Sequence, residues 1–456
     1  MQVPEPKVEN MPTIDTGDTA WVLVSAAMVA LMTPALAFFY GGMVRVKSVL
    51  NMMMMSFGAL ALVTVLWVLY GYLLAFGNSV GGAGLLGNPS EFFGLKSLMS
   101  PDSVAGTVPT MAFVAFQAVF AIITVALISG AIADRARFGT WMVFAGIWAT
   151  LVYFPVAHWV FAFSSKDGTY TGGWIANKLG AIDFAGGTAV HINAGAAGLA
   201  LAVVLGKRIG FGKTAFRPHN LPFVMLGAGL LWFGWFGFNA GSALSAGTTA
   251  SIVWVTTLSA SAIGALAWMV TEKIRDGHAT SLGAASGMVA GLVAITPACS
   301  SVNILGALAI GLCAGVLCAL AVGLKYRFGL DDSLDVVGVH LVGGLVGTLM
   351  IGLVATEEAP AAVSGLFYGG GLSQLGKQAG AAGAVLAFSL IMTFAIGYAL
   401  KRTMGWRLTP DEEREGIDSV AHAETAYDSS DGHTGVPHTS TPSLVSRSQT
   451  EEGVPC

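Results

Sequence analysis

The sequence predicts an all-α polytopic membrane protein with eleven transmembrane helices, arranged as an inverted five-helix repeat plus an eleventh helix. Of its 456 residues, 54% are hydrophobic and only 11% are charged, whereas a soluble domain carries about 25% charged residues. Glycine contributes 60 residues, and small residues let membrane helices approach closely. The net charge of −4 favours no particular class of partner.

Eleven stretches of the chain are apolar over about twenty residues, the length that spans a bilayer. Two GxxxG runs within them, at Gly283, Gly287 and Gly291 and at Gly343 and Gly347, predict tight helix packing. The predicted helices are 20–42, 49–76, 109–132, 139–161, 183–205, 221–239, 250–272, 281–300, 304–324, 335–356 and 379–400.

The distribution of Lys and Arg predicts the orientation in the membrane. The loops after helices 1, 3, 5, 7 and 9 hold twelve of these residues, the tail after helix 11 holds five, and the opposite side holds five. The N-terminus is therefore expected outside and the C-terminal tail in the cytoplasm. The acidic first twenty residues lack the positive region of a signal peptide, so the first helix is expected to be retained.

The tail after the last helix has two parts of different composition. Its first part mixes charges with Ile417, Val420 and Tyr427, and is expected to dock on basic cytoplasmic loops such as 207–217. Its second part is rich in Ser, Thr and Gly and has little to bury. The predicted division is an extracellular segment at 1–19, a transmembrane domain at 20–400, a cytoplasmic regulatory tail at 401–427 and a disordered C-terminus at 428–456.

Two histidines occupy matched places in the predicted repeat. Helices 1–5 and 6–10 form halves with an odd number of helices, which inverts one half relative to the other, a common transporter plan. His191 lies in the last helix of the first half and His340 in the last helix of the second. Titratable groups deep in a bilayer usually serve a function. The symmetry predicts that the two neutral rings meet centrally and share a proton; the alternative is two separate histidines satisfied by backbone or hydroxyl groups.

Asp183 stands at the outer end of the segment that contains His191. Eight residues separate the two, or about 12 Å along a helix, and their side chains would point about 80° apart. Half of the hydrocarbon core is about 15 Å. We therefore expect Asp183 near the outer surface, His191 near the midplane, and no direct contact between them.

Aromatic residues and a serine gather near the outer end of helix 6, in WFGWFGFNAGS at 232–242. Aromatic faces attract cations, and a serine oxygen can accept a hydrogen bond from a cation that has only donors. Phe113, Phe116, Gln117 and Phe120 follow helical spacing on helix 3. Both groups are candidates for a cation site, and the alternative for both is a belt of interfacial aromatics.

Several other site classes are excluded by spacing or context. GAGLLG at 82–87 matches GxGxxG but follows no strand and opens no helix, so it is no nucleotide site. The four cysteines show no metal or disulfide spacing. No motif of a hydrolase or of a nucleic-acid surface occurs. We expect neither an enzyme nor a bound cofactor.

Five specific motifs stand out in the chain. They are DFAGGTAVHINAG at 183–195, WFGFNAGSA at 235–243, GLVAITPACSSV at 291–302, DVVGVHLVGG at 335–344 and EREGIDSVAHAETAY at 413–427. On these motifs the chain, from about Ala20 to Tyr427, resembles the Amt/Mep/Rh family of ammonium transporters, in its bacterial Amt-like form.

The resemblance implies a homotrimer in the lipid bilayer, with one pore per subunit, and a tail that couples subunits and meets a PII-type signal protein. His191 and His340 match the paired pore histidines of the family, and Trp235 matches a pore-lining tryptophan. Phe120 and Phe238 match the two phenylalanines that close the pore from outside.

The same resemblance implies an ammonium recruitment site. Ser242 matches its hydroxyl and Asp183 the acid that supports it. The family usually has a tryptophan at the end of helix 4, where this chain has Phe161, a weaker cation–π partner. Trp174, in the longer loop that follows, is the alternative contributor.

The sequence thus predicts an ammonium transporter of the plasma membrane. It recruits ammonium outside, deprotonates it and conducts ammonia, while the proton either stays behind or moves through the histidine pair. The main alternative is an ammonium sensor that signals through its tail, although the tail carries no recognisable effector domain. An ion-coupled transporter of another solute would want acids at the midplane, and a membrane hydrolase would need a nucleophile beside His191.

Overall fold

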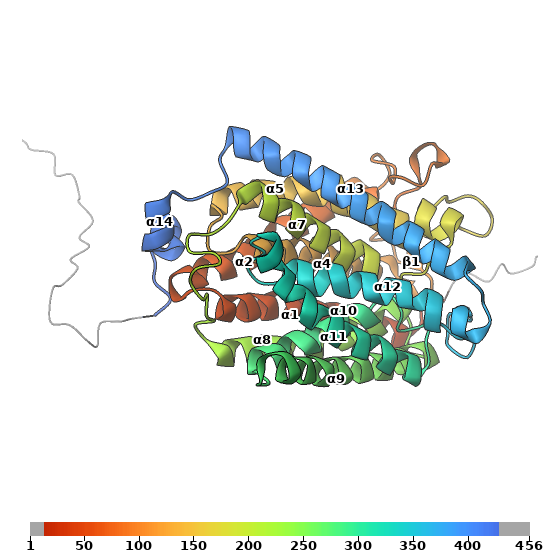
Figure 1. The fold of residues 1–456 in the computed structure, drawn as a ribbon. Coiled ribbons are helices and arrows are strands. Elements are labelled where there is room, and N and C mark those ends of the chain that lie inside the picture. Colours follow the sequence, from red (N-terminus) through yellow and green to blue (C-terminus); the bar gives the residue numbers. More distant parts are fainter. Residues whose placement is uncertain (1–12, 428–456) are drawn as a thin grey trace, which may run out of the picture.

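The computed structural model describes residues 13–427 as a bundle of long helices that lie side by side (Figure 1). The last described segment, with α14 (Pro410–Glu415), lies at one end of the bundle, and β1 (Val104–Ala105) lies at the other. We call these the tail end and the far end. The predicted disordered C-terminus, 428–456, and most of the predicted N-terminal segment lie outside the described residues.

Ten of the predicted helices are confirmed as helical runs long and apolar enough to cross a membrane, counted over residues 13–427. Four of them combine α-helical and π-helical segments. In chain order they are α1 (Thr16–Met43); α2 (Val49–Leu66), η2 (Trp67–Gly71) and α3 (Tyr72–Phe76); α4 (Thr110–Ile128); α5 (Phe138–Trp148), η6 (Ala149–Tyr153) and α6 (Phe154–Phe161); η8 (Gly187–Ile192) and α7 (Asn193–Leu205); α8 (Leu221–Ala240); α9 (Thr248–Asp276); α11 (Ile304–Phe328); η10 (Val337–Leu341) and α12 (Val342–Val354); and α13 (Ser373–Thr403).

The predicted helix at 281–300 is shorter than expected. It forms α10 (Ser281–Ile295) and then leaves the helical path. Pro297 follows two residues later, and proline lacks the backbone N–H that would continue the helical hydrogen bonds. The remaining short elements are η1 (Val46–Ser48), η3 (Val80–Gly82), η4 (Phe93–Leu95), β2 (Val108–Pro109, antiparallel to β1), η5 (Ser129–Ile132), η7 (Ile175–Leu179), η9 (Gly241–Ala243), η11 (Leu366–Tyr368) and η12 (Asp418–His422).

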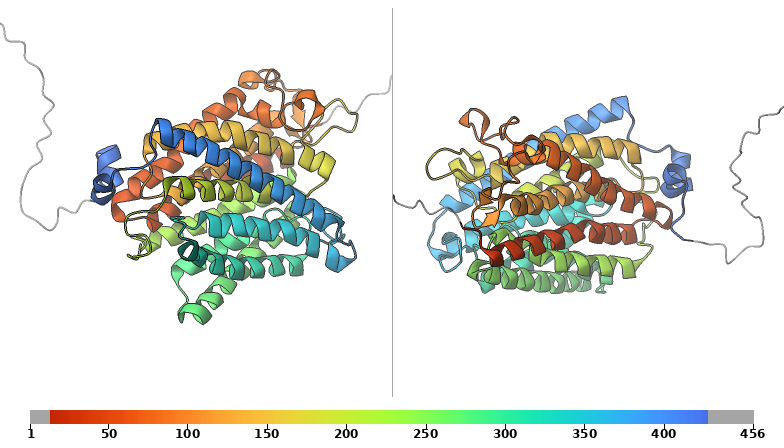
Figure 2. Two further views of the ribbon diagram at one scale, coloured as in Figure 1. Left: turned by 45° about the horizontal axis from the view of Figure 1, so that its top comes forward. Right: turned by 180° about the vertical axis from the view of Figure 1, so that it is seen from behind.

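The glycine runs bring helices into close contact, as predicted. A Cβ on Gly287 or Gly291 would overlap α9, and one on Gly347 would overlap the backbone of Ala294 in α10. Close approach increases van der Waals contact, which holds membrane helices together where lipid removes the hydrophobic driving force. The long helix α13 runs along the outside of the bundle from the far end to the tail end and packs on α7 and α12 (Figure 2).

Buried ion pairs fasten the loops at the tail end. Arg208 pairs with Asp331 at 2.8 Å and with Asp134 at 3.0 Å, and all three side chains are almost fully buried. Arg135 donates to the Ser333 hydroxyl at 2.6 Å, and burial lowers the pKa of its guanidinium to about 10. Buried charges are stable only when paired and hydrogen-bonded, so this cluster holds the loops before α5, α8 and η10 in one arrangement.

Candidate functional site

Two imidazole rings meet in the middle of the bundle. His191 comes from η8 and His340 from η10, and their exposed fractions are 1% and 4%. Their Nδ1 atoms lie 3.3 Å apart, and the rings are inclined by 18° with centroids 5.4 Å apart. One ring donates and the other accepts across this contact. The structure therefore joins the two histidines that the sequence singled out.

The two histidine-bearing segments share an uncommon backbone. Both η8 and η10 are π-helical and pass directly into α-helices. Such turns are rare and occur frequently at functional sites. The α-helical spacing expected between Asp183 and His191 does not apply, because the helix begins only at Gly187 and Asp183 precedes it.

Asp183 caps the start of η8. Its Oδ1 accepts hydrogen bonds from the N–H groups of Gly186 at 2.7 Å and Gly187 at 2.6 Å. Its Oδ2 accepts from the N–H groups of Thr188 at 2.7 Å and Ala189 at 3.2 Å, and from the Thr188 hydroxyl. Gly186 has φ +117°, a conformation that glycine adopts without penalty. Five donors saturate the carboxylate, whose charge stabilises the positive end of the helix.

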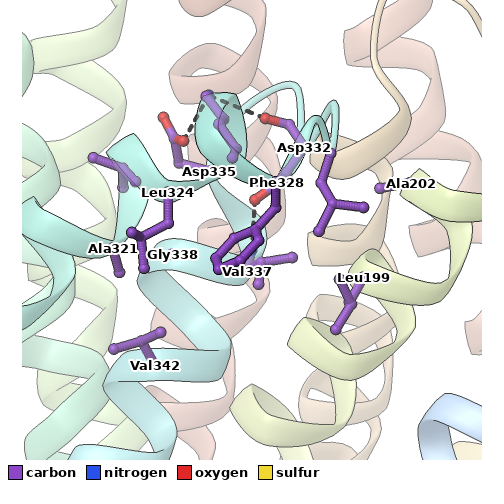
Figure 3. Close-up of a pocket in the computed structure, with 13 residues that line it drawn as sticks. Leu199, Ala202, Ala321, Leu324, Phe328, Asp332, Asp335, Val337, Gly338 and Val342 are labelled. Atoms are coloured by element: carbon purple, nitrogen blue, oxygen red, sulfur yellow. Dashed lines mark hydrogen bonds and ion pairs between the residues drawn. The ribbon is translucent and has the colours of Figure 1, made fainter. Parts of the chain in front are cut away.

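Asp332 caps η10 in a similar way. Its carboxylate accepts from the N–H groups of Val336 at 3.1 Å and Val337 at 2.8 Å. Burial, reinforced by the neighbouring charge of Asp335, raises the pKa of the Asp332 carboxyl to about 6. Asp332 and Asp335 line a cavity of about 210 Å³ at the tail end, between α7, α11 and η10 (Figure 3).

Sequence reasoning missed Asp332, although a signal was present. It precedes His340 by eight residues, the same separation as between Asp183 and His191. Asp335, the first residue of the motif at 335–344, is only five residues from His340 and does not match this spacing. The Asp335 side chain instead pairs with Lys325 at 2.7 Å.

An aromatic stack lies beside the histidine pair. Trp235 stacks on His191 with ring centroids 5.5 Å apart, and Phe238 lies 6.1 Å from the same imidazole. Phe120 meets Phe238 with centroids 4.3 Å apart. Both phenylalanines have exposed fractions of 1%. The structure thus brings Phe120, Phe238 and Trp235 together from α4 and α8.

The orientation of Trp235 is set by residues that sequence reasoning missed. Its Nε1 donates to the Thr296 hydroxyl at 2.9 Å. That hydroxyl lies 3.2 Å from Oδ1 of Asn239, whose amide donates to Thr257 at 3.0 Å. All of these side chains are buried. The chain of polar contacts fixes the indole from behind and leaves its face toward the imidazole.

The space between the stack and the histidines is narrow and apolar. A cavity of about 10 Å³ is lined by both histidines, Trp235 and Phe238, with aliphatic side chains such as Leu36 around them. A volume of about 10–15 Å³ is the least that holds one water molecule. A hydrated ion does not fit this passage.

A wider cavity opens at the far end, on the other side of the phenylalanines. It has a volume of about 550 Å³, and Phe120, Phe161, Gln117 and Ser242 line it. The Ser242 hydroxyl donates to the Phe238 carbonyl at 2.8 Å. A hydroxyl oxygen used as donor keeps its lone pairs as acceptors. The cavity therefore offers aromatic faces and, at Ser242, a hydroxyl oxygen that can accept a hydrogen bond.

Phe161 and Trp174 occupy different places. Phe161 also lines a second far-end cavity of about 450 Å³, together with Asp183 and Ser242. Trp174 packs on Trp159 with centroids 5.9 Å apart and is not among the residues that line either cavity. The geometry favours Phe161 over Trp174 as the aromatic neighbour of Ser242.

The tail docks on the bundle mainly through acidic side chains. Glu413 is fully buried, accepts from the N–H of Ile209 at 2.7 Å and pairs with Arg407 at 2.9 Å. Asp418 accepts from the N–H groups of Leu50 at 3.0 Å and Asn51 at 2.8 Å, at the start of α2.

The apolar contacts expected for the tail are only partly found. Ile417 is buried, but Val420 and Tyr427 are 36% and 41% exposed. Of the basic loop 207–217, the Ile209 N–H is the group to which Glu413 binds. The acidic residues dominate because each accepts hydrogen bonds from backbone N–H groups, which hydropathy patterns do not reveal.

Within residues 13–427, no cluster of three or more His, Cys, Asp or Glu side chains could hold a metal ion. The assembled site therefore consists of a far-end cavity, an aromatic barrier and a histidine pair, with a docked tail at the opposite end of the bundle.

Comparison with known proteins gives a consistent match over most of the chain. The sequence pattern of the Ammonium Transporter Family matches residues 20–427. An ammonium transporter of Mycobacterium tuberculosis (strain H37Rv) is 63% identical over 435 residues, which cover 91% of each chain. The crystal structure of Saccharomyces cerevisiae Mep2 superimposes with a TM-score of 0.81 at 35% identity and covers 92% of this chain and 93% of its own.

A further similar structure bears the description "Sensor Amt Protein". It superimposes with a TM-score of 0.81 at 29% identity and covers 90% of this chain and 98% of its own. With ten helices long and apolar enough to span a bilayer in the described part, the chain is a multi-pass membrane protein, and it belongs to the ammonium transporter family.

Proposed function

We propose that this protein moves ammonium nitrogen across the cell membrane by deprotonating ammonium at the far end and conducting ammonia past the histidine pair. The observation that carries the proposal is the contact of 3.3 Å between the Nδ1 atoms of His191 and His340, at the narrow apolar cavity that both rings line. Two neutral imidazoles in contact can hold or pass a proton, because each ring has one donor and one acceptor.

The apolar constriction makes deprotonation necessary. Moving a charged ion without partners into an apolar passage carries a very large free-energy penalty, whereas ammonia is small and neutral. Potassium cannot lose a proton and would meet the full penalty. The same barrier of Phe120, Phe238 and Trp235 therefore supplies both closure and selectivity. The proton either stays outside or moves separately along the histidines.

Recruitment is assigned to the far-end cavity. Phe120 and Phe161 offer aromatic faces, and cation–π attraction is worth about 0.5–2 kcal/mol according to desolvation. The Ser242 hydroxyl oxygen accepts a hydrogen bond from ammonium. Asp183 contributes through its charge and through the helix that it holds, because its oxygens already accept five hydrogen bonds.

The membrane arrangement belongs to the same proposal. We infer that α10 and the ten longer helical runs all cross the bilayer, as an inverted five-helix repeat plus α13, with the far end outside and the tail in the cytoplasm. The transport unit is 20–400, and 401–427 regulates it. The assembly is a homotrimer with one pore per subunit, and the tail meets a PII-type signal protein.

A second candidate function is ammonium sensing through the tail. The likeness to the "Sensor Amt Protein" and the buried contacts of Glu413 and Asp418 favour it. The two functions differ in what must cross the membrane, since a pure sensor needs binding alone.

The test is transport by the purified protein in proteoliposomes, with ammonium stepped on one side. We expect uptake that saturates with ammonium, recorded by internal pH and by membrane current, and no response to potassium. Current would show that charge moves with the nitrogen, and alkalinisation without current would show net ammonia movement. Saturable binding without transport would support the sensor instead.

Ser242→Ala is expected to weaken apparent ammonium affinity more than maximal rate. The hydroxyl acts at recruitment and not at the barrier. Loss of one hydrogen bond to a charged group corresponds to roughly a tenfold rise in half-saturation. Ser245→Ala, three residues along and outside the cavity lining, is the matched control. Equal half-saturation in both variants would refute the recruitment role.

The tail is expected to divide functionally at Tyr427. Truncation after Tyr427 should leave transport intact, whereas truncation before Asp411 should reduce it or abolish its regulation. The shorter protein loses the buried anchors Glu413 and Asp418, and loss of one helix cap alone costs about 0.5–2 kcal/mol. Uptake and its response to nitrogen supply should be compared in cells.

Asp418→Asn provides the matched point variant, since it keeps the tail but weakens the cap on α2. It should lie between the two truncations. Identical activity and regulation in all three proteins would show that the docked tail has no role in transport.

A further inference from the structure

The outer helix α13 makes a buried polar contact that the proposed mechanism leaves unused. Gln378, in its second turn, has an exposed fraction of 0%. A buried side-chain amide is unfavourable unless its donors and acceptor find partners. The partners of Gln378 lie in the two segments that lead to and from the histidine pair.

The Gln378 amide binds the backbone of Ile182 in both directions. Its Nε2 donates to the Ile182 carbonyl at 2.7 Å, and its Oε1 accepts from the Ile182 N–H at 2.7 Å. The same Oε1 accepts from the Gln374 amide at 2.9 Å. Because Ile182 presents one donor and one acceptor, a single orientation of the amide satisfies both. The side chain thus pairs with Ile182 as a neighbouring β-strand would.

Ile182 directly precedes the acid that caps η8. On the other side of Asp183, the N–H of Phe184 donates to the Pro297 carbonyl at 3.2 Å. The segment is therefore fixed on both flanks of Asp183. Phe184 and Ser242 line both far-end cavities, so a shift of this segment would reshape the cavity wall around the candidate cation site.

Gln378 also reaches the second histidine-bearing unit. Its Nε2 lies 3.3 Å from the carbonyl of Thr348 in α12, the helix that continues η10 and His340. A single side chain thus contacts the chain that enters η8 and the helix that leaves η10. Gln378 lies in the helix that the sequence places outside the five-helix repeat.

We propose that Gln378 is a positioning residue for cation recruitment, which sets the place of the Ile182–Phe184 segment and so the shape of the far-end site. The proposal rests on the proposed transport function. It concerns the cavity wall and not the barrier, so loss of the amide should change how strongly ammonium is taken up and leave the maximal rate nearly unchanged.

Two other polar contacts of α13 serve as controls. Gln374 lies one turn earlier and donates to Gln378, whereas the described side-chain hydrogen bonds to the Ile182 backbone come from Gln378. The Ser389 hydroxyl, further along α13, donates at 2.8 Å to the carbonyl of Asn193 in α7. Gln374→Leu and Ser389→Ala therefore loosen α13 without removing the contacts to the Asp183 segment.

The experiment measures half-saturation and maximal rate of ammonium transport for purified Gln378→Leu in proteoliposomes. We expect half-saturation to rise about fivefold, the factor that corresponds to one net hydrogen bond, with a maximal rate within about twofold of the unchanged protein. Both controls should keep half-saturation within about twofold. Half-saturation equal to that of the controls would overturn the proposal, as would a fall in maximal rate alone.

A second variant keeps the test decisive if the leucine protein does not fold. Gln378→Glu has the same volume and, when protonated, again offers one donor and one acceptor to Ile182. At high pH the glutamate is ionised and has no donor for the Ile182 carbonyl, so the half-saturation of this variant should rise above that of both controls measured at the same pH, and the difference should shrink as the pH is lowered. Half-saturation equal to that of the controls at every pH would overturn the proposal. Failure of the transport function itself would appear differently, as absence of saturable transport in the unchanged protein.

Discussion

His191→Ala and His340→Ala should each reduce ammonium flux by about two orders of magnitude, the range typical for loss of an acid–base group. Without its partner, the remaining imidazole has no ring to which it can pass a proton across the 3.3 Å contact. The cavity left by alanine should also admit water and weaken the exclusion of potassium. Flux and potassium permeability in proteoliposomes measure both effects.

Glutamine at the same positions separates chemistry from packing. His191→Gln and His340→Gln keep a polar side chain but cannot take up a proton, so they should lose flux while excluding potassium better than the alanine variants. His278→Ala, at an exposed position, is the control for histidine removal as such. All variants should keep the oligomeric state of the unchanged protein. Normal flux and potassium exclusion in both alanine variants would end the proposed role.

Asp183→Ala is expected to have the second large effect, on stability as well as transport. It removes the acceptor of four backbone N–H groups and one hydroxyl. Each hydrogen bond to a charged group is worth roughly 1.5–3 kcal/mol, although water entering the site can replace part of this. The melting temperature in detergent should fall clearly, and flux should be lost with it.

Further variants separate the contributions of charge and geometry to the loss expected for Asp183→Ala. Asp183→Asn keeps one acceptor oxygen without the charge and should be intermediate. Asp183→Glu keeps the charge but displaces it, and full activity in that variant would contradict the need for a fixed geometry. Asp332→Ala leaves only two N–H groups without an acceptor, so it should be less destabilising. Glu358→Ala, at an exposed position, should be neutral.

The sequence alone was sufficient for the helices and for the identity of the central pair. A bilayer-spanning helix is recognised from length and hydropathy, which are local properties, and ten predicted segments appear as such helices. His191 and His340 stood out because a titratable group is rare in apolar surroundings. The motif resemblance selected Phe120, Phe238 and Ser242, and the structure makes them neighbours, since Phe120 packs on Phe238 and the Ser242 hydroxyl donates to the Phe238 carbonyl.

Residues whose roles depend on partners far along the chain escaped sequence reasoning. Thr296 orients Trp235 from 61 residues away, and Gln378 holds Ile182 from 196 residues away. A buried glutamine or threonine in an apolar helix has no pattern of its own, since many such residues bond within their own helix. Asp332 was an exception, because its eight-residue spacing to His340 was readable.

The sequence thus determined that this chain spans a membrane, where ten of its long helices lie, and which two histidines are candidates for a central pair. Tertiary structure alone decided that Phe161 rather than Trp174 lines the cavity with Ser242, that Asp183 is saturated by backbone donors, and that the tail docks through buried acids. The physical reason is that hydropathy acts along the chain, whereas each hydrogen bond needs a donor and an acceptor whose relative positions only the packed helices define.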